Sequence, residues 1–252
     1  QKIPVFFTFD ANYLLAAKVA IHSMMKHASR QYWYELYVFH TTLSPKAQQS
    51  LRNSLKEFTH TELHFIDVTQ YNEKIKNFGT KAHYSKEIFY KLIATDVLPQ
   101  YDRIICSDVD VVFTGDFSPV FFMFPNEKFY YAGVGPVENS RMPYYRKDFS
   151  TTEMEILEHE IAAGFLLINL KELRNDHKQE EIINFYVNNY PRLRLPEQDC
   201  IILTCWPYIK YLPIDYSLPI SFYRLNMNQR DFYQGNTEFA GDKATALAKF
   251  NK

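Results

Sequence analysis

The order of apolar runs in the first half of the chain constrains the fold more than any other feature. Four such runs alternate with segments whose apolar residues recur at helical spacing. They cover Ile3–Phe9, Tyr34–Thr41, Thr61–Val68 and the stretch that follows Arg103. Strands that alternate with helices are typical of an α/β fold with a mostly parallel sheet. Ligands of such sheets bind where the carboxyl ends of the strands meet.

The helical segments between these runs carry ordinary start and packing signals. Ser44 followed by Pro45 is a typical helix N-terminus, because the serine side chain caps and proline suits the first turn. In the segment that starts near Leu14, apolar residues recur at the spacing that places them on one face of a helix. A third helix is expected over Ser85–Leu98.

The second half of the chain is less regular. Ala163–Leu170 is expected to form a strand, and Asp176 with Gln179 has the spacing of a capping box that opens a helix. Another short helix is expected after Pro196, and a strand over Ile209–Ile214. No linker, repeat or low-complexity stretch divides the sequence, so its 252 residues are expected to form a single domain.

Composition excludes several classes of function. The net charge is −1 and lysine and arginine form no block, which argues against a nucleic-acid partner. The three cysteines match neither a zinc spacing nor an even disulfide set, so they are expected to be reduced thiols in the cytoplasm. No apolar run approaches the length of about 18 residues that a membrane-spanning helix needs.

Two aspartates follow the fourth apolar run. Asp108 and Asp110 are spaced i, i+2, so an extended segment would aim both carboxylates at one spot. Hard oxygen donors suit Mg²⁺ or Mn²⁺, ions that share their coordination with substrate phosphates. Asp10 follows the first run and belongs at the same edge of the sheet. These residues predict a metal-assisted site for a phosphate-bearing substrate.

Five segments, in this order, resemble glycosyltransferase family 8, a retaining group that includes bacterial lipopolysaccharide glucosyl- and galactosyltransferases and glycogenin. They are Ile3–Tyr13, Ile88–Leu92, Ser107–Asp110, Ala163–Leu170 and Glu197–Asp199. The resemblance implies a single-domain GT-A-like fold, with a Rossmann-like nucleotide-binding half over about residues 1–115 and an acceptor-side half over 116–252.

The resemblance also implies roles for individual residues. Those matching nucleotide- and donor-contacting positions are Thr8, Asp10, Asn12, Tyr13, Tyr84, Lys91, Asp108, Val109 and Asp110. Asp10 would accept a hydrogen bond from uracil, and the ring of Tyr13 would stack on it. Asp108 and Asp110 would hold the metal, and Asp110 would also count as catalytic. Positions on the substrate side are Ala163, Glu197 and Gln198. Gln198 would lie near the anomeric carbon as the second catalytic residue.

Each assignment has a plainer structural alternative. Asn12 would cap the first helix, and Lys91 would be an exposed helix lysine. Asp108 and Asp110 would be solvated carboxylates at the end of a strand. Glu197 and Gln198 would belong to the first turn of a helix, where acidic residues are favoured.

The chain departs from the family pattern at several positions. Lys91 stands where arginine is usual, Glu197 where aspartate is usual and Ala162 where asparagine is usual. A carboxylate that holds the donor sugar is missing near residues 132–136. The C-terminal segment that would supply a metal-binding histidine is also missing, so a truncated chain and a more weakly held metal are expected.

The resulting expectation is a bacterial hexosyltransferase of cell-surface polysaccharide biosynthesis. It would move glucose or galactose from a UDP-sugar to a glycan or glycoconjugate acceptor, with Mn²⁺ or Mg²⁺ and with retention of configuration. Front-face attack is expected, since no carboxylate nucleophile is evident. The cytoplasm is the expected location; attachment to the inner face of the membrane through a missing C-terminal tail is left open. Two alternatives remain: a catalytically impaired nucleotide-sugar-binding protein, and a haloacid-dehalogenase-type phosphatase.

Overall fold

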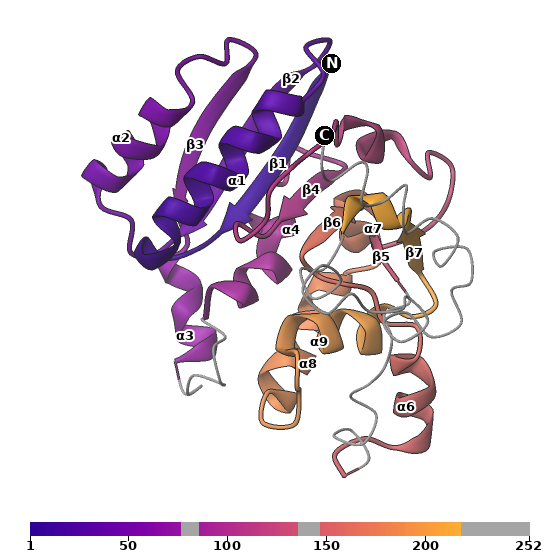
Figure 1. The fold of residues 1–252 in the computed structure, drawn as a ribbon. Helices are drawn as coiled ribbons and strands as arrows, with labels where there is room; N and C mark the ends of the chain where they lie inside the picture. The colour runs from indigo at the N-terminus through magenta and orange to yellow at the C-terminus, as the bar shows by residue number, and fades with distance from the viewer. Residues whose placement is uncertain (77–85, 136–146, 218–252) are drawn as a thin grey trace, which may run out of the picture.

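The fold is described here from a computed structural model that covers residues 1–76, 86–135 and 147–217. Seven strands form one mixed sheet in the order β3-β2-β1-β4-β6-β5-β7 (Figure 1). The strands are β1 Lys2–Thr8, β2 Trp33–His40, β3 Thr61–Asp67, β4 Ile104–Ser107, β5 Tyr131–Val134, β6 Phe165–Ile168 and β7 Ile209–Leu212.

The first four strands are parallel to one another, as the alternation of strands and helices predicts. β6 is antiparallel to both of its neighbours, β4 and β5, while β7 is parallel to β5. All six residues of Ile3–Thr8 are buried, as expected for a central strand covered on both faces. The predicted α/β fold with a mostly parallel sheet is therefore confirmed.

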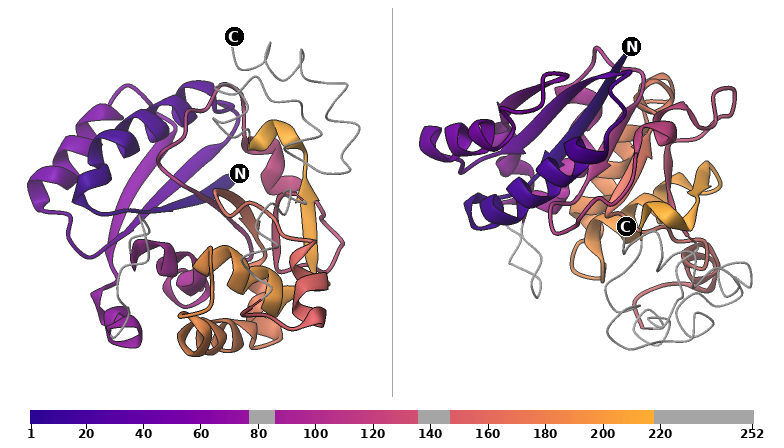
Figure 2. Two further views of the ribbon diagram at one scale, coloured as in Figure 1. Left: turned by 60° about the horizontal axis from the view of Figure 1, so that its bottom comes forward. Right: turned by 45° about the horizontal axis from the view of Figure 1, so that its top comes forward.

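Helices cover both faces of the sheet (Figure 2). Two hydrophobic cores lie between these helices and the strands. One core packs against α1 and α2, the other against α8 and α9. The α-helices are α1 Leu14–His27, α2 Pro45–Ser54, α3 Asn72–Ile75, α4 Ala94–Val97, α6 Thr151–Leu157, α7 Leu170–Asn175, α8 Lys178–Asn189 and α9 Pro196–Cys205. The 3₁₀ helices are η1 Ala11–Tyr13, η2 Thr69–Tyr71, η3 Lys86–Ile93, η4 Ser118–Phe122 and η5 Ile214–Tyr216.

The helix expected over Ser85–Leu98 is wrong as a single α-helix. Residues 86–93 form the 3₁₀ helix η3 and only Ala94–Val97 is α-helical. The five successive side chains of 89–93 are all buried. An amphipathic surface helix exposes one of its faces, whereas this segment passes through the interior. Its backbone geometry is therefore set by packing against the surrounding residues.

The local start signals were correct for one helix and wrong for another. Ser44 caps α2 by accepting from the backbone N–H of Ala47. Asp176, by contrast, does not cap α8, whose N-cap is His177 in a left-handed conformation. The Asp176 carboxylate instead accepts from the Tyr130 hydroxyl and pairs with Lys128, both at 2.6 Å. The carboxylate that the local pattern assigned to helix capping therefore binds Tyr130 and Lys128, which are distant in sequence.

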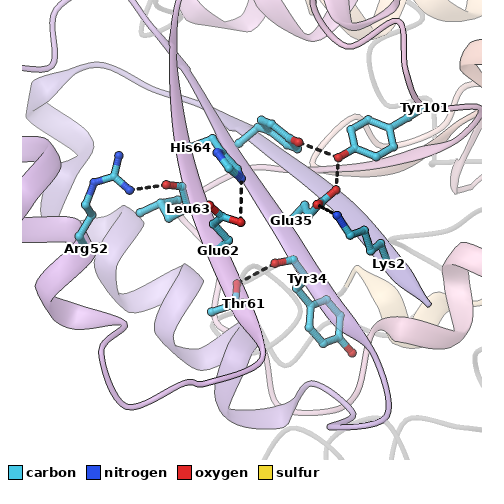
Figure 3. A network of polar contacts seen from close by, with 10 residues as sticks. Lys2, Tyr34, Glu35, Arg52, Thr61, Glu62, Leu63, His64 and Tyr101 are labelled. Carbon is cyan, nitrogen blue, oxygen red and sulfur yellow. Dashed lines mark hydrogen bonds and ion pairs between the residues drawn. The ribbon is translucent and has the colours of Figure 1, made fainter.

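A polar network lies at the amino-terminal edge of the sheet (Figure 3). Glu35 on β2 accepts from Lys2 on β1 through Oε1 and from the Tyr101 hydroxyl through Oε2. The hydroxyls of Tyr37 and Tyr101 form a hydrogen bond of 2.6 Å, and the ring of Tyr37 stacks on that of His64. Both carboxylate oxygens of the buried Glu35 are therefore hydrogen-bonded. We call Lys2, Glu35, Tyr37 and Tyr101 the amino-edge network.

Candidate functional site

The candidate site lies at the opposite edge, where β1 and β4 end side by side. The two strands are paired in parallel through Val5 with Ile105 and Phe6 with Cys106. Asp10 follows β1 and Asp108 follows β4, so the fold places both carboxylates at the carboxyl edge, as predicted.

An ion cluster around a buried lysine lies at this edge. Lys91 Nζ lies 2.7 Å from Asp108 Oδ1 and 3.2 Å from Glu197 Oε1. It also donates to the carbonyl oxygen of Ala163 at 3.1 Å. Three elements far apart in sequence, η3, the end of β4 and the start of α9, thus meet at one ammonium group. We call Lys91, Asp108 and Glu197 the Lys91 cluster.

Lys91 is not the exposed helix lysine of the plainer alternative. Its side chain is only 1% exposed. Burial by itself would lower the pKa of Lys91, but the charges of Asp108 and Glu197 outweigh burial and raise it above its usual value. Lys91 is therefore a buried cation that is charged because two carboxylates face it.

β4 ends at Ser107, so Asp108 follows the strand directly and Asp110 lies in a bend two residues further on. The expectation of one extended segment that carries both carboxylates is therefore wrong. The backbone N–H of Asp108 donates to the carbonyl of Gly164 at 2.8 Å. Burial is the main influence raising the pKa of the Asp108 carboxyl; Lys91 opposes it, and the charges of Glu197 and Asp110 add to it. The carboxylates here outnumber the positive charges around them.

These carboxylates suit a divalent cation. Asp108 Oδ2 and both oxygens of Asp110 accept no hydrogen bond from the described residues, and the Asp110 side chain is exposed. A Cβ added to Gly164 would lie 3.3 Å from Asp108 Oδ2, so glycine leaves room beside that oxygen. Within the described ranges no group of three or more His, Cys, Asp or Glu side chains gathers as a complete ligand set. A hard cation would therefore need further oxygens from a ligand and from water.

Glu197 and Gln198 face the same spot from the first turn of α9. The Asp199 carboxylate accepts from the backbone N–H groups of Arg194 and Leu195, which fixes the loop that leads into the helix. Gln198 Oε1 accepts from the backbone N–H of Ala163 at 3.0 Å. Because the carbonyl of this amide is engaged, its NH₂ group remains as a donor. Membership of a helix first turn is confirmed, and it coexists with placement at the site.

One oxygen of Glu197 has no partner in the described structure. Glu197 Oε1 contacts Lys91, while Oε2 is buried and accepts no hydrogen bond from a described residue. Native proteins rarely leave a buried carboxylate oxygen unsatisfied without a reason. A ligand hydroxyl that donates to Oε2 would remove this deficit.

The residues after β1 form a separate part of the site. Thr8 Oγ1 donates to the carbonyl of Glu87 at 2.8 Å, which ties β1 to η3. Asp10, not Asn12, is the cap: its Oδ1 accepts from the backbone N–H of Asn12 at 2.8 Å. The expectation that Asn12 caps the helix is wrong, because the carboxylate two residues earlier satisfies the turn. The ring of Tyr13 is 41% exposed and available for contact with a ligand.

Two of the residues predicted to contact the nucleotide, Tyr84 and Val109, are not seen in this arrangement. Tyr84 lies outside the described residues. Val109 is buried in the hydrophobic core that packs against α1 and α2, and its side chain makes no polar contact at the site. The residue that sequence reasoning missed is Gly164, although the pattern Ala162-Ala163-Gly164 before an apolar strand was a signal of close backbone packing.

The structure also explains one departure from the family pattern. A Cβ on Gly135 would lie 2.7 Å from the carbonyl oxygen of Glu160, and a Cβ on Gly133 would lie 2.9 Å from that of Ala162. The backbone of 160–162 therefore packs directly against β5. Neither position has room for a carboxylate side chain unless that backbone moves.

Comparison with known proteins identifies the class. The model of glycosyl transferase family 8 matches residues 4–240. No curated protein matches the chain. In the described part of the chain, no helix has both the length and the apolar character needed to cross a membrane.

Several solved glycosyltransferases share the fold. The galactosyltransferase LgtC in complex with donor and acceptor sugar analogues has a TM-score of 0.70 and 17% identity, covering 88% of this chain and 78% of that chain. Mouse xyloside xylosyltransferase 1 has a TM-score of 0.65 and 15% identity, covering 94% and 92%. The bifunctional glycosyltransferase WbbM has a TM-score of 0.68 and 20% identity, covering 85% of this chain but only 39% of that protein. The glycosyltransferase GlyE from Streptococcus pneumoniae TIGR4 has a TM-score of 0.65 and 18% identity, covering 89% of this chain and 48% of that chain. This chain thus spans less than two thirds of the length of both WbbM and GlyE. At these identities the likeness establishes a GT-A-type fold.

Proposed function

This chain belongs to glycosyltransferase family 8, and on that premise we propose that it transfers a hexosyl group from a UDP-sugar to a glycan or glycoconjugate acceptor, with metal assistance and retention of configuration. The observation that carries the proposal is the Lys91 cluster beside Gln198 at the carboxyl edge of the sheet. Family membership excludes the phosphatase alternative.

The end of β1 would hold the nucleotide. The ring of Tyr13, which is exposed, would stack on uracil, and the carboxylate of Asp10 would accept a hydrogen bond from the base. Thr8 and Asn12 keep this segment in place through their own hydrogen bonds. We assign about residues 1–115 to the nucleotide-binding half and 116–252 to the acceptor-side half.

Asp108 and Asp110 would hold Mn²⁺ or Mg²⁺ together with the diphosphate. When bound, the ion supplies Lewis-acid stabilisation of the negative charge on the departing diphosphate. The open oxygens Asp108 Oδ2 and Asp110 Oδ support this assignment. With two carboxylates from the described residues, we expect the metal to bind together with the nucleotide and only weakly alone.

The remaining polar groups would orient the hexose. Glu197 Oε2 would accept from a sugar hydroxyl, and the Gln198 amide would donate near the anomeric carbon. Lys91 would keep Glu197 and the Ala163 carbonyl in position. We expect front-face attack: the acceptor oxygen bonds to the anomeric carbon as the bond to UDP breaks, and the hydroxyl proton passes to the leaving diphosphate.

Glucose or galactose is our proposed donor sugar. The proteins that share the fold include a galactosyltransferase and a xylosyltransferase. We also propose a cytoplasmic location, supported by the three free, buried cysteines.

A second candidate is a nucleotide-sugar-binding protein without turnover. It is favoured by Ala162, which lacks the amide usual in the family, and by Gly135, which has no room for a side chain. It would keep UDP-sugar binding and give no transfer.

Titration of UDP by calorimetry, with and without Mn²⁺, tests the metal assignment. We expect tight binding only with Mn²⁺, and Asp110→Asn should abolish that difference while lowering transfer by at least about 100-fold. Metal-independent binding of UDP would contradict the role of Asp110. Because Asp110 is exposed, its variant should unfold like the wild type.

Turnover and stereochemistry need separate assays. Release of UDP from UDP-glucose and UDP-galactose over a panel of glycan acceptors measures transfer. The anomeric configuration of the product by NMR decides retention, and an intact covalent glycosyl–protein adduct in mass spectrometry would refute front-face attack. Binding without any turnover would favour the second candidate.

A further inference from the structure

A surface groove lies along α1 and shares no lining residue with the Lys91 cluster. It has a volume of about 540 Å³ and lies between α1 and residues 112–114. The backbone N–H of Phe113 donates to Ser23 Oγ at 3.0 Å and holds the two segments together. The lining residues are Lys18, Val19, His22, Ser23, Lys26, His27, Ser54, Val112, Phe113 and Thr114.

The ionisable side chains that line this groove are all basic. Two lysines and two histidines line it, and none of the described lining residues is acidic. Lys18 Nζ donates to Ser50 Oγ, a neutral partner, and Lys26 is exposed without an ion pair to any described residue. Glu57, outside the lining, pairs with His22 at 2.6 Å. The two lysine charges are therefore not neutralised by described carboxylates.

Aliphatic side chains project outward around the same groove. Leu15 is 75% exposed, Val19 is 49% exposed and Val112 is 57% exposed. Leu15 and Val19 are four residues apart on α1 and share one face of the helix. A free anion bound to the lysines would leave these side chains in water, whereas a lipid interface accommodates both the charges and the apolar groups.

We propose that this α1 surface, defined by Leu15, Lys18, Val19, Lys26 and Val112, docks on an anionic phospholipid membrane. Lys18 and Lys26 would contact lipid phosphates, and the three aliphatic side chains would enter the boundary between headgroups and acyl chains. Val112 follows Asp110 by two residues, so docking would bring the carboxyl edge of the sheet close to the membrane. The proposal is independent of the reaction proposed above.

Co-sedimentation with vesicles tests it on the full chain. We expect binding to phosphatidylcholine vesicles that contain phosphatidylglycerol, weak binding to pure phosphatidylcholine, and loss of binding as salt rises. The double variant Lys18→Gln/Lys26→Gln should bind anionic vesicles about 25-fold more weakly, since each lysine near the surface contributes about fivefold. Leu15→Ser/Val19→Ser should also weaken binding, but without changing its salt dependence.

The matched control is Lys74→Gln/Lys171→Gln, which removes two exposed lysines outside the groove. It should bind like the wild type, and all variants should keep the wild-type unfolding midpoint and UDP affinity. Equal binding to both kinds of vesicle, or an equal loss in groove and control variants, would overturn the proposal. So would full displacement by inorganic phosphate at matched ionic strength, which would indicate a site for a free anion.

Discussion

In the described residues, the amino-edge network and the Lys91 cluster lie at opposite edges of one sheet, and they differ in how many of their carboxylate oxygens are hydrogen-bonded. In the amino-edge network both oxygens of Glu35 are hydrogen-bonded, to Lys2 and Tyr101. In the Lys91 cluster, Glu197 Oε2 and Asp108 Oδ2 accept no hydrogen bond from any described residue. A network that serves stability satisfies its own groups, whereas a binding site keeps acceptors for a ligand.

The two cations also differ. Lys91 is 1% exposed, while Lys2 is 64% exposed and reaches Glu35 from the surface. Water can replace the ammonium of Lys2, but it has little access to that of Lys91. The same type of ion pair should therefore carry very different free energies at the two edges.

Removal of each lysine gives the largest contrast. Lys91→Met should lower the free energy of unfolding by about 3–5 kcal/mol, because it leaves Asp108 and Glu197 facing each other without a cation. Lys2→Met should cost less than about 1 kcal/mol. Urea denaturation of both variants measures the difference.

A double variant distinguishes charge from packing. Lys91→Met/Glu197→Gln should recover part of the loss, since one of the two uncompensated carboxylates is gone. Equal losses in Lys91→Met and Lys2→Met would mean that burial of the cation does not separate the two networks.

A smaller effect is expected from Glu35 and should depend on pH. Burial tends to raise the pKa of Glu35, but hydrogen bonds from Lys2 and Tyr101 outweigh it and lower the pKa below its usual value. The stabilisation is therefore present above the unfolded-state pKa of about 4.3 and is lost as pH falls through the lower folded-state pKa. Glu35→Gln should cost about 2 kcal/mol at neutral pH.

The difference between wild type and Glu35→Gln should shrink in acid, which urea denaturation over a pH series would show. Glu62→Gln is the control, because Glu62 is largely exposed and 3.8 Å from His64. It should change stability by less than about 0.5 kcal/mol. A pH-independent cost for Glu35→Gln would rule out the ionised carboxylate as the stabilising group.

The smallest effect should come from filling the space beside an open oxygen. Gly164→Ala would place a methyl group 3.3 Å from Asp108 Oδ2, tighter than an ordinary contact. We expect UDP affinity in the presence of Mn²⁺ to fall by about three- to tenfold, with a stability change below about 1 kcal/mol. Calorimetric titration and thermal unfolding measure the two quantities. An unchanged affinity would show that this oxygen does not face the ligand.

The strands of the first half and their edge were predictable because the signals are local. A run such as Ile3–Phe9 is apolar on both faces, and a buried parallel strand needs that pattern. Asp10 and Asp108 follow such runs, so topology alone assigns them to the ligand edge. The order of the matched segments also predicted the family.

Tertiary contacts alone decided the rest. The 3₁₀ geometry of η3, the burial of Lys91 and the diversion of Asp176 to Tyr130 depend on partners that are distant in sequence. Lys91 and Glu197 are separated by 106 positions, and only the folded chain brings them to 3.2 Å. Sequence by itself determined the strands of the sheet and the edge at which we propose that a ligand binds, because periodicity acts over a few residues. The structure decided which carboxylates are neutralised and which remain open, because electrostatic contacts act through space.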